Sequence, residues 1–251
     1  MIFYTFASQE MEYKDRAIVL RTVKYGDNKL IVDLLTRESG RVSVVWKVST
    51  SRTSKVRKQF FQPLTLLEVD MERSPRQAMA ALGDARLFRP YVSLTADAVK
   101  ISQGFFVAEF LVYATRDMHP EPLLYDFVEQ GLLWLDATVG STANFHLMFM
   151  LRMSRFLGFM PDVGTYVDGA VFDLREGVFS ATMPLHRDVL MPEDAKKMQI
   201  LMRMTPSNLH LFRFSREERN RVVDLCLKFY RLHIPQFGEM KTLEVLQALF
   251  V

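Results

Sequence analysis

A strongly basic segment, residues 37–58, contains the side chains of this sequence best suited to binding another molecule. It holds seven cations and one acid, Glu38, so its net charge of +6 exceeds the +3 of the whole chain. The cations are Arg37, Arg41, Lys47, Arg52, Lys55, Arg57 and Lys58. An overlapping stretch, KVSTSRTSKVRKQF (residues 47–60), has no acid and several Ser and Thr residues. Two interpretations are open, a solvated connector or a binding site for a polyanion.

The sequence lacks the motifs that most catalytic sites require. It has no Gly-x-x-x-x-Gly-Lys-Ser/Thr phosphate loop, no Gly-x-Gly-x-x-Gly motif and no Gly-x-Ser-x-Gly motif. The five histidines are scattered, and none has the spacing of a metal ligand. Cys226 lies in an apolar run that is typical of a buried, unreactive thiol. These observations favour a binding protein over an enzyme.

Composition sets further limits. A chain of 251 residues, 49% hydrophobic and 24% charged, can form one large or two modest domains. Because Cys226 is the only cysteine, disulfides within the chain and cysteine-rich zinc sites are excluded, and a reducing, cytoplasmic compartment is expected. No apolar run reaches the roughly 20 residues that span a bilayer. Residues 1–12 are expected to be a dispensable extension, since Met11 could also begin the chain.

Short apolar runs separated by turn residues predict five strands, at residues 17–20, 30–35, 41–47, 63–70 and 79–87. Five short strands in residues 13–88 indicate a small closed antiparallel barrel of the OB type, in which nucleic acid crosses one strand face and the adjoining loops. Alternation in the third strand places Arg41, Ser43, Val45 and Lys47 on one face and Val42, Val44 and Trp46 on the other. Four aromatic residues are close enough in sequence to stack on bases, although the core is the more usual place for each: Tyr25, Trp46, Phe60 and Phe61.

Residues 89–251 have helical periodicity, so the predicted fold class is α+β. Helices are expected at residues 96–115, 123–137, 143–159, 192–204, 215–233 and 241–250. The third is hydrophobic on nearly all sides, which predicts a buried central helix. Ser215, followed by two acids, is a good helix start. An irregular insert at residues 162–191 contains an alternating pattern that predicts a small hairpin.

Three sequence stretches together resemble a known family. They are AIVLRTVKYGDNKLIVDLLTRESGRVSVVWKVSTSRTSK near the start, FMLRMSRFLGFMPDV in the middle and FYRLHIPQFGEMKTLEVLQALF near the end. In this order they resemble the bacterial recombination mediator family RecO over nearly the whole chain from Met11. The resemblance implies an OB barrel followed by a helical domain, and a protein that binds single- and double-stranded DNA and anneals complementary strands. It also implies action with RecR to displace single-stranded-DNA-binding protein so that RecA can load, without nucleotide hydrolysis, in the cytoplasm at the nucleoid.

The chain departs from this family at one place. Many relatives carry a four-cysteine zinc site after the middle motif, whereas the corresponding stretch here, PDVGTYVDGAVFDLREGVFS, has no cysteine. No cofactor is therefore expected. A hairpin packed by Phe172, Leu174, Val178 and Phe179 is expected to hold this region instead.

A second basic cluster surrounds the penultimate predicted helix. The simplest interpretation of this cluster is that it forms the solvated face of an amphipathic helix. The resemblance implies another role, as a site for the acidic, Phe-ending tail of single-stranded-DNA-binding protein, which needs a cation for its carboxylate and an apolar pocket for its ring. The residues predicted for this site are Phe212, Arg216, Arg219 and Lys241.

Two other functional classes remain as alternatives. A barrel that binds only proteins, with a merely solvated basic loop, would bind no nucleic acid. A metal-dependent nuclease would need clustered carboxylates for Mg²⁺, and no such cluster is seen in the sequence.

Overall fold

The computed structural model describes residues 11–48, 58–73, 79–116 and 118–249. The chain forms two compact units. One consists of Met1–Val92 with Thr115–Leu132, and the other of Ser93–Ala114 with Leu133–Val251. The predicted domain boundary at residue 88 lies close to the end of the first segment. However, the barrel unit also includes Thr115–Leu132, which we predicted to belong to the helical domain, residues 89–251.

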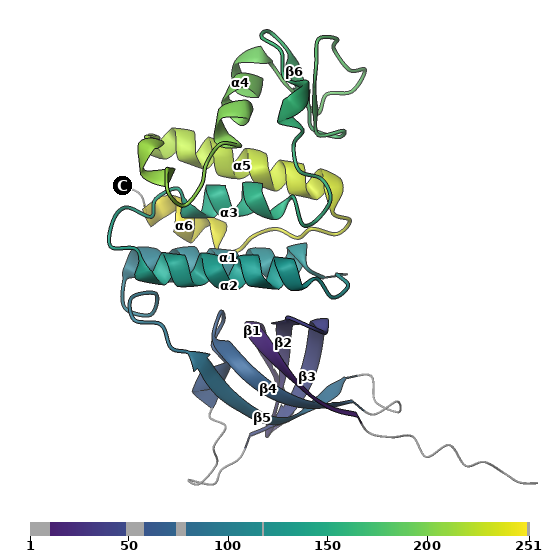
Figure 1. Ribbon diagram of the computed structural model, residues 1–251, viewed down its shortest axis with the longest axis vertical. Coiled ribbons are helices and arrows are strands. Elements are labelled where there is room, and N and C mark those ends of the chain that lie inside the picture. Colours follow the sequence, from purple (N-terminus) through teal and green to yellow (C-terminus); the bar gives the residue numbers. More distant parts are fainter. Residues whose placement is uncertain (1–10, 49–57, 74–78, 117, 250–251) are drawn as a thin grey trace, which may run out of the picture. The chain divides into compact units, whose positions relative to one another are not determined.

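The first unit is built on a closed barrel of five strands in the order β1-β2-β3-β5-β4 (Figure 1). The strands are β1 Met11–Tyr25, β2 Lys29–Thr36, β3 Gly40–Lys47, β4 Leu66–Arg73 and β5 Ala80–Arg89. The expected five-stranded barrel is confirmed, but one pair, β3 with β5, is parallel rather than antiparallel. Strand β1 is far longer than predicted because its first half pairs with β4 and its second half with β2.

Alternation along β2 and β3 separates a buried face from an outer one. Leu30, Val32, Val44 and Trp46 belong to the barrel core, which confirms the predicted inward face of the third strand. The Trp46 ring lies 4.7 Å from that of Phe61, and Phe60 packs against the same core. Tyr25 is the exception among the four aromatics, because 53% of its surface is exposed.

Gly40 allows the chain to turn between β2 and β3. Its φ of +70° lies in the left-handed region that residues with a Cβ avoid. A Cβ at this position would lie 2.9 Å from the backbone nitrogen of Pro120. The carbonyl of Gly40 also accepts a hydrogen bond from the Thr36 hydroxyl. Both the turn and the close approach of the 119–120 backbone therefore require glycine.

All six predicted helices are present. They are α1 Ala98–Ala114, α2 Pro122–Ala137, α3 Phe145–Met153, α4 Pro192–Leu201, α5 Arg216–His233 and α6 Leu243–Leu249. Eight of the nine residues of α3 are buried, as expected of a central helix, but α3 ends six residues early, before Gly158 turns the chain with a φ of +82°. Ser215 and Glu218 form the reciprocal capping box at the start of α5. Within the described ranges, no helix is both long and apolar enough to cross a bilayer.

The predicted hairpin in the insert is confirmed and gains a third strand. Strands β6 Val171–Asp173, β7 Val178–Ser180 and β8 Val189–Leu190 form a sheet in the order β7-β6-β8. Of the four residues expected to pack it, Phe172, Leu174 and Phe179 are buried, whereas Val178 is only partly buried. The carboxylate of Asp188 forms ion pairs with Arg175 at 2.8 Å and with Lys228 of α5 at 3.0 Å. Apolar packing and these two ion pairs thus hold the insert in place.

A pair of glycine substitutions tests the turn at Gly40. Gly40→Ala should lower the free energy of unfolding by about 2–3 kcal/mol, because it combines left-handed strain with a clash against backbone. Gly26→Ala is the matched control, since Gly26 has a φ of +67° but a Cβ added there would have no atom within 4 Å. It should cost only about 1 kcal/mol. Urea unfolding of both variants measures the difference, and equal losses would contradict the role of Pro120.

Candidate nucleic-acid interface

The outer face of β1, β2 and β3 is arranged in three cross-strand rows. Register pairs Arg21 with Asp33 and Asp33 with Ser43 in the first row. The second row is apolar and joins Val23, Ile31 and Val45, and the third joins Tyr25, Lys29 and Lys47. Because side chains on one face recur every second residue, consecutive rows are about 7 Å apart. One face of the barrel therefore presents charge, an apolar strip and then charge with an aromatic ring.

The third row contains two like charges directly opposite each other. Lys29 and Lys47 are register partners, and both are exposed. Within the described residues neither has an ion pair, and directly opposed like charges destabilise a sheet. Tyr25 stands beside Lys29 in the same row. The acid nearest in sequence is Asp27, in the turn between β1 and β2. We call Tyr25, Lys29, Lys47 and Lys58 the lysine end of the barrel.

Of the seven cations predicted from the sequence, the four that the structure describes do not form one patch. Lys47 ends β3, and Lys58 begins the 3₁₀ helix η1 Lys58–Phe61, whose Phe61 ring packs against Trp46, so both lysines lie at the same end of the barrel. Arg37 and Arg41 lie at the other end of β2 and β3, about 20 Å away at about 3.3 Å per residue. The remaining three, Arg52, Lys55 and Arg57, lie outside the described residues, and their role stays a prediction.

Arg37 binds acids rather than standing free in solvent. Its Nε donates to Asp126 of α2 at 2.8 Å, and it also bonds to Glu38. Arg16 of β1 reaches the same Asp126 at 3.4 Å and Glu129 at 3.0 Å. The hydrogen bond from Arg37 holds the pKa of the Asp126 carboxyl below its ordinary value. Arg37 thus joins the β2–β3 turn to α2 within the barrel unit, a role that the sequence did not reveal.

Arg41 is likewise held by an acid. Only 12% of its side chain is exposed, and its Nη2 lies 3.0 Å from the Asp33 carboxylate. Its Nη1 donates to Thr115 at 3.3 Å. Burial alone would raise the pKa of Asp33, but hydrogen bonds from Ser43 and Arg21, and the charges of both arginines, outweigh it and keep the pKa below its usual value. Asp33 is therefore ionised at neutral pH and neutralises part of the charge that was predicted to bind phosphate.

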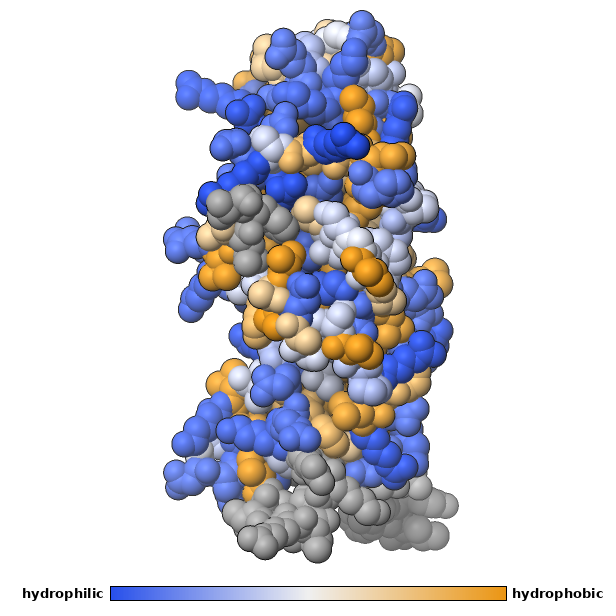
Figure 2. All heavy atoms as spheres, turned by 90° about the vertical axis from the view of Figure 1, so that its left-hand side faces the viewer, coloured by the Kyte–Doolittle hydropathy of each residue, from blue (hydrophilic) through white to orange (hydrophobic). Residues whose placement is uncertain are grey.

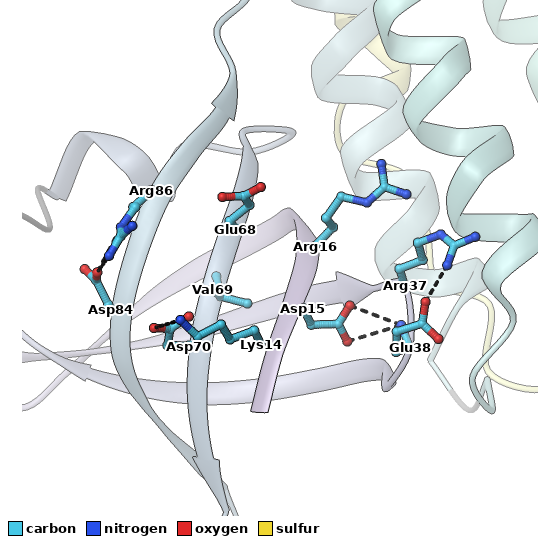
Figure 3. A pocket seen from close by; sticks show the side chains of 10 residues that line it. All are labelled: Lys14, Asp15, Arg16, Arg37, Glu38, Glu68, Val69, Asp70, Asp84 and Arg86. Atoms are coloured by element: carbon cyan, nitrogen blue, oxygen red, sulfur yellow. Dashed lines mark hydrogen bonds and ion pairs between the residues drawn. The ribbon is translucent and has the colours of Figure 1, made fainter. Parts of the chain in front are cut away.

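A separate hollow of about 400 Å³ lies against β1, β4 and β5 (Figure 3). Five acids and four cations line it, and three of the cations are paired with acids of the same lining: Lys14 with Asp70, Arg86 with Asp84, and Arg37 with Glu38. Glu68 projects between Arg16 and Arg86 in Figure 3 and has no ion-pair partner among the described residues. A phosphate would meet net negative charge here, so this side of the barrel disfavours a polyanion.

The helical unit contains an apolar hollow of about 330 Å³ with a cationic rim. Its apolar lining includes Ile200, Leu211 and Phe212, and its rim carries the cations Lys197, Arg213 and Arg221. Spacing of three and four residues along α5 brings Glu218, Arg221 and Val222 to one side of the helix. On the face drawn in Figure 2, hydrophobic residues lie in small groups between hydrophilic ones rather than in one broad patch. The hollow is therefore recognised by its concave shape and its lining residues, not by a large hydrophobic patch on the surface.

The four residues predicted to bind an acidic tail are not brought together. Phe212 lines the hollow. Arg216 donates to the Gln247 carbonyl at 3.0 Å, and the backbone of Lys241 is bonded to Glu109 of α1. Arg219 is 8% exposed and donates to Asn144 at 3.1 Å and to the Phe214 carbonyl at 3.2 Å. Arg219 is thus a structural residue, since it fixes the segment that forms one wall of the hollow.

Sequence reasoning missed several residues of both surfaces. Lys29 was overlooked because it stands alone in sequence and meets Lys47 only through strand register. Tyr25 was one of four aromatics near enough in sequence to stack on bases, but only the structure separates it from the other three, since β1 continues to Tyr25 and leaves it exposed. On the helical unit, Arg213 and Arg221 belonged to the basic cluster recognised from the sequence, but only the fold separates them from Arg216 and Arg219.

Comparison with known proteins gives a consistent result over both units. Residues 11–91 match the family model described as Recombination protein O N terminal, and residues 95–243 match Recombination protein O C terminal. The DNA repair protein RecO of Phocaeicola vulgatus is 40% identical over 240 residues, which cover 96% of this chain and 100% of that protein. RecO of Bacteroides fragilis is 37% identical over 241 residues, covering 96% and 100%. RecO of Porphyromonas gingivalis is 35% identical over 239 residues, covering 94% and 98%.

The link between Arg37 and Asp126 predicts a pH-dependent contribution to stability. The folded pKa of Asp126 is lowered, so its contribution is present above the unfolded value of about 4 and is lost as the pH falls through the folded value. Asp126→Asn should therefore cost about 1 kcal/mol at pH 7 and progressively less below about pH 4. Urea midpoints at both pH values measure this. Asp168→Asn, whose side chain is 91% exposed, is the control. A pH-independent loss in Asp126→Asn would contradict the ion-pair explanation.

Proposed function

This chain belongs to the RecO family of DNA repair and recombination proteins, and from that membership we propose that its lysine end binds single-stranded DNA. The DNA backbone would lie on Lys29 and Lys47, with a base stacked on Tyr25. The basic loop that follows Lys47 would extend the same contact along the strand. Since most of the interaction is with phosphate, duplex DNA would bind as well, with little dependence on sequence.

The observation that carries this proposal is the opposed pair of lysines. Two cations at register partners repel each other, and neither forms an ion pair with an acid among the described residues. A phosphate placed between them would remove the repulsion and release counterions at the same time. An exposed tyrosine in the same row supplies the other element of single-strand binding, a flat surface on which any base can stack.

The acidic side of the barrel supports a defined path for the DNA. The hollow lined by Glu68, Asp70 and Asp84 would repel phosphate. The DNA strand would therefore bind at the positively charged lysine end instead. A strand held there by its backbone keeps its bases open to a second strand. Annealing would follow, because partial neutralisation of one strand lowers its repulsion of the complementary one.

We propose the hollow on the helical unit as the site for the acidic tail of single-stranded-DNA-binding protein. The terminal phenylalanine ring would enter among Ile200, Leu211 and Phe212, and Arg213 and Arg221 would bind its carboxylates. This set replaces Arg216, Arg219 and Lys241 of the sequence-based prediction. With that protein held and its DNA on the barrel, the chain would act with RecR so that RecA can load.

The proposed role involves binding alone, without bond cleavage and without a cofactor. The insert that holds zinc in many relatives is joined here by a small sheet, buried phenylalanines and the ion pairs of Asp188. These contacts serve the structural purpose that a four-cysteine zinc site serves in a small loop.

The lysine end is tested by titrating labelled oligothymidine at several salt concentrations. Lys29→Ala with Lys47→Ala should weaken binding and lower the slope of log K against log [NaCl] by up to about 1.4, or about 0.7 per lost phosphate contact. Tyr25→Ala should weaken binding by about 1–3 kcal/mol while leaving the slope unchanged, since stacking releases no counterion.

The control is Lys14→Ala, which removes one lysine charge from an 82% exposed side chain on the acidic side of the barrel. It should leave both affinity and slope unchanged. If the lysine variants keep the full slope, the lysine end takes no part in DNA binding. If the wild-type protein binds no DNA, a barrel that contacts only proteins becomes the better explanation.

The tail site is tested by calorimetry with a synthetic acidic peptide that ends in phenylalanine. Arg213→Ala with Arg221→Ala should weaken peptide binding at least tenfold, because each charge-assisted hydrogen bond contributes about 1.5–3 kcal/mol. Arg231→Ala, an exposed arginine on the same helix but outside the hollow, should bind like the wild type. Equal peptide affinities for the wild type, the double variant and Arg231→Ala would exclude this hollow as the site.

A further inference from the structure

An acid faces outward on the proposed DNA-binding face and yet is buried. Asp33 lies in the first row of the outer face, between Arg21 of β1 and Ser43 of β3, and is 4% exposed. Its Oδ2 accepts from Arg21 Nε at 2.5 Å and from Arg41 Nη2 at 3.0 Å, and its Oδ1 accepts from Ser43 Oγ at 2.5 Å. Two guanidinium groups thus cover a single carboxylate in the first row of this face, beside the apolar row.

The two arginines differ in what they can still offer. Arg41 is almost enclosed and also donates to Thr115, so it is fixed in the wall of the barrel. Arg21 has a side chain that is 55% exposed, and its bond to Asp33 uses only Nε. A guanidinium carries five N–H donors, so the Nη groups of Arg21 face solvent while its charge is partly cancelled by Asp33.

Arg21 also lies in line with the lysine end. It precedes Tyr25 by four residues on the same face of β1, about 13 Å along the strand, and Asp33 follows Lys29 by four residues on β2. Val23, Ile31 and Val45 form the apolar row between them, and Val23 is 48% exposed. A strand that leaves Tyr25 and crosses this row therefore arrives at Arg21.

We propose that Asp33 is a positioning residue that restrains Arg21 and so limits the number of DNA phosphates that the barrel neutralises. This inference rests on the proposed function of the lysine end. Asp33 competes with phosphate for the guanidinium of Arg21. Its carboxylate binds Arg21 more strongly than phosphate does, because it is buried and is also held in place by Ser43 and Arg41. The barrel then grips DNA mainly at the lysine end and releases the strand more readily, as a protein that passes DNA to another protein requires.

The test is the salt-dependent titration of labelled oligothymidine, carried out with Asp33→Asn. The amide removes the negative charge but keeps the size and an acceptor oxygen, so Arg21 can turn to phosphate. Affinity at 50 mM NaCl should rise about three- to tenfold, and the slope of log K against log [NaCl] should become steeper by about 0.7, which corresponds to one added phosphate contact. A loss of folding cannot produce tighter binding with a steeper slope.

Three further variants locate the effect. Asp70→Asn makes the same charge change on the outer face of β4, where Asp70 is paired with Lys14, and should leave the slope unchanged. Arg21→Ala combined with Asp33→Asn should abolish the gain. Arg21→Ala alone, in which Asp33 keeps Arg41 and Ser43 as partners, should bind within twofold of the wild type.

Three results would overturn the proposal. They are an Asp33→Asn protein with wild-type affinity and slope, an equal gain from Asp70→Asn, and a loss greater than fivefold from Arg21→Ala alone, since the last would mean that Arg21 already holds phosphate. Failure of the lysine end itself appears differently. In that case the wild type binds no DNA or the lysine variants match it, and the role of Asp33 fails together with the proposed function.

Discussion

Closure of the five-stranded barrel decides which side chains of this protein must face water. A closed sheet has a single interior, so alternate residues of every strand point into one core, and their neighbours point outward. Leu30, Val32, Val44 and Trp46 fill that interior. Because Leu30 and Trp46 point inward, their neighbours Lys29 and Lys47 must point outward, where they are register partners. The repulsion between the two lysines thus follows from the packing of the barrel core.

The outward-facing charges are sorted by strand. The β1, β4 and β5 side carries acids, most of them paired with nearby cations, and the rim at β2 and β3 carries lysines without a described acid partner. A polyanion thus meets repulsion on one side and attraction on the other. In our proposal Asp33 adds to this sorting, since it neutralises part of the charge of Arg21 and Arg41 and leaves the lysine end as the main binding surface. The net charge of +3 does not reveal this arrangement, because it is a sum over the whole chain and carries no information about position.

The helical unit uses buried polar contacts to shape its surface. Asn144 donates to the Phe212 carbonyl at 2.7 Å and accepts from Arg219, and Arg219 in turn holds the Phe214 carbonyl. These bonds fix residues 212–214 as a wall of the apolar hollow. A buried guanidinium without hydrogen-bond acceptors costs free energy, so the conformation of the wall in which Arg219 keeps its two acceptors is favoured. A preformed wall reduces the ordering that a bound peptide must pay for.

The sequence by itself determined the kinds of elements and the family. Strict alternation identified the faces of the third strand, and the all-round apolar pattern of residues 143–159 identified the buried helix, because both follow from periodicity along the chain. Ser215 and Glu218 indicated the start of α5 for the same local reason. By contrast, the grouping of Arg37 and Arg41 with Lys47 reflected sequence distance alone, because these residues lie at opposite ends of β2 and β3. Only the tertiary structure decided that Arg37 and Arg41 bind Asp126 and Asp33, that Lys29 meets Lys47, and that Arg221 rather than Arg219 faces the hollow. Those outcomes depend on which strands and helices become neighbours, and the charge of a side chain is available to a ligand only where no neighbour has already neutralised it.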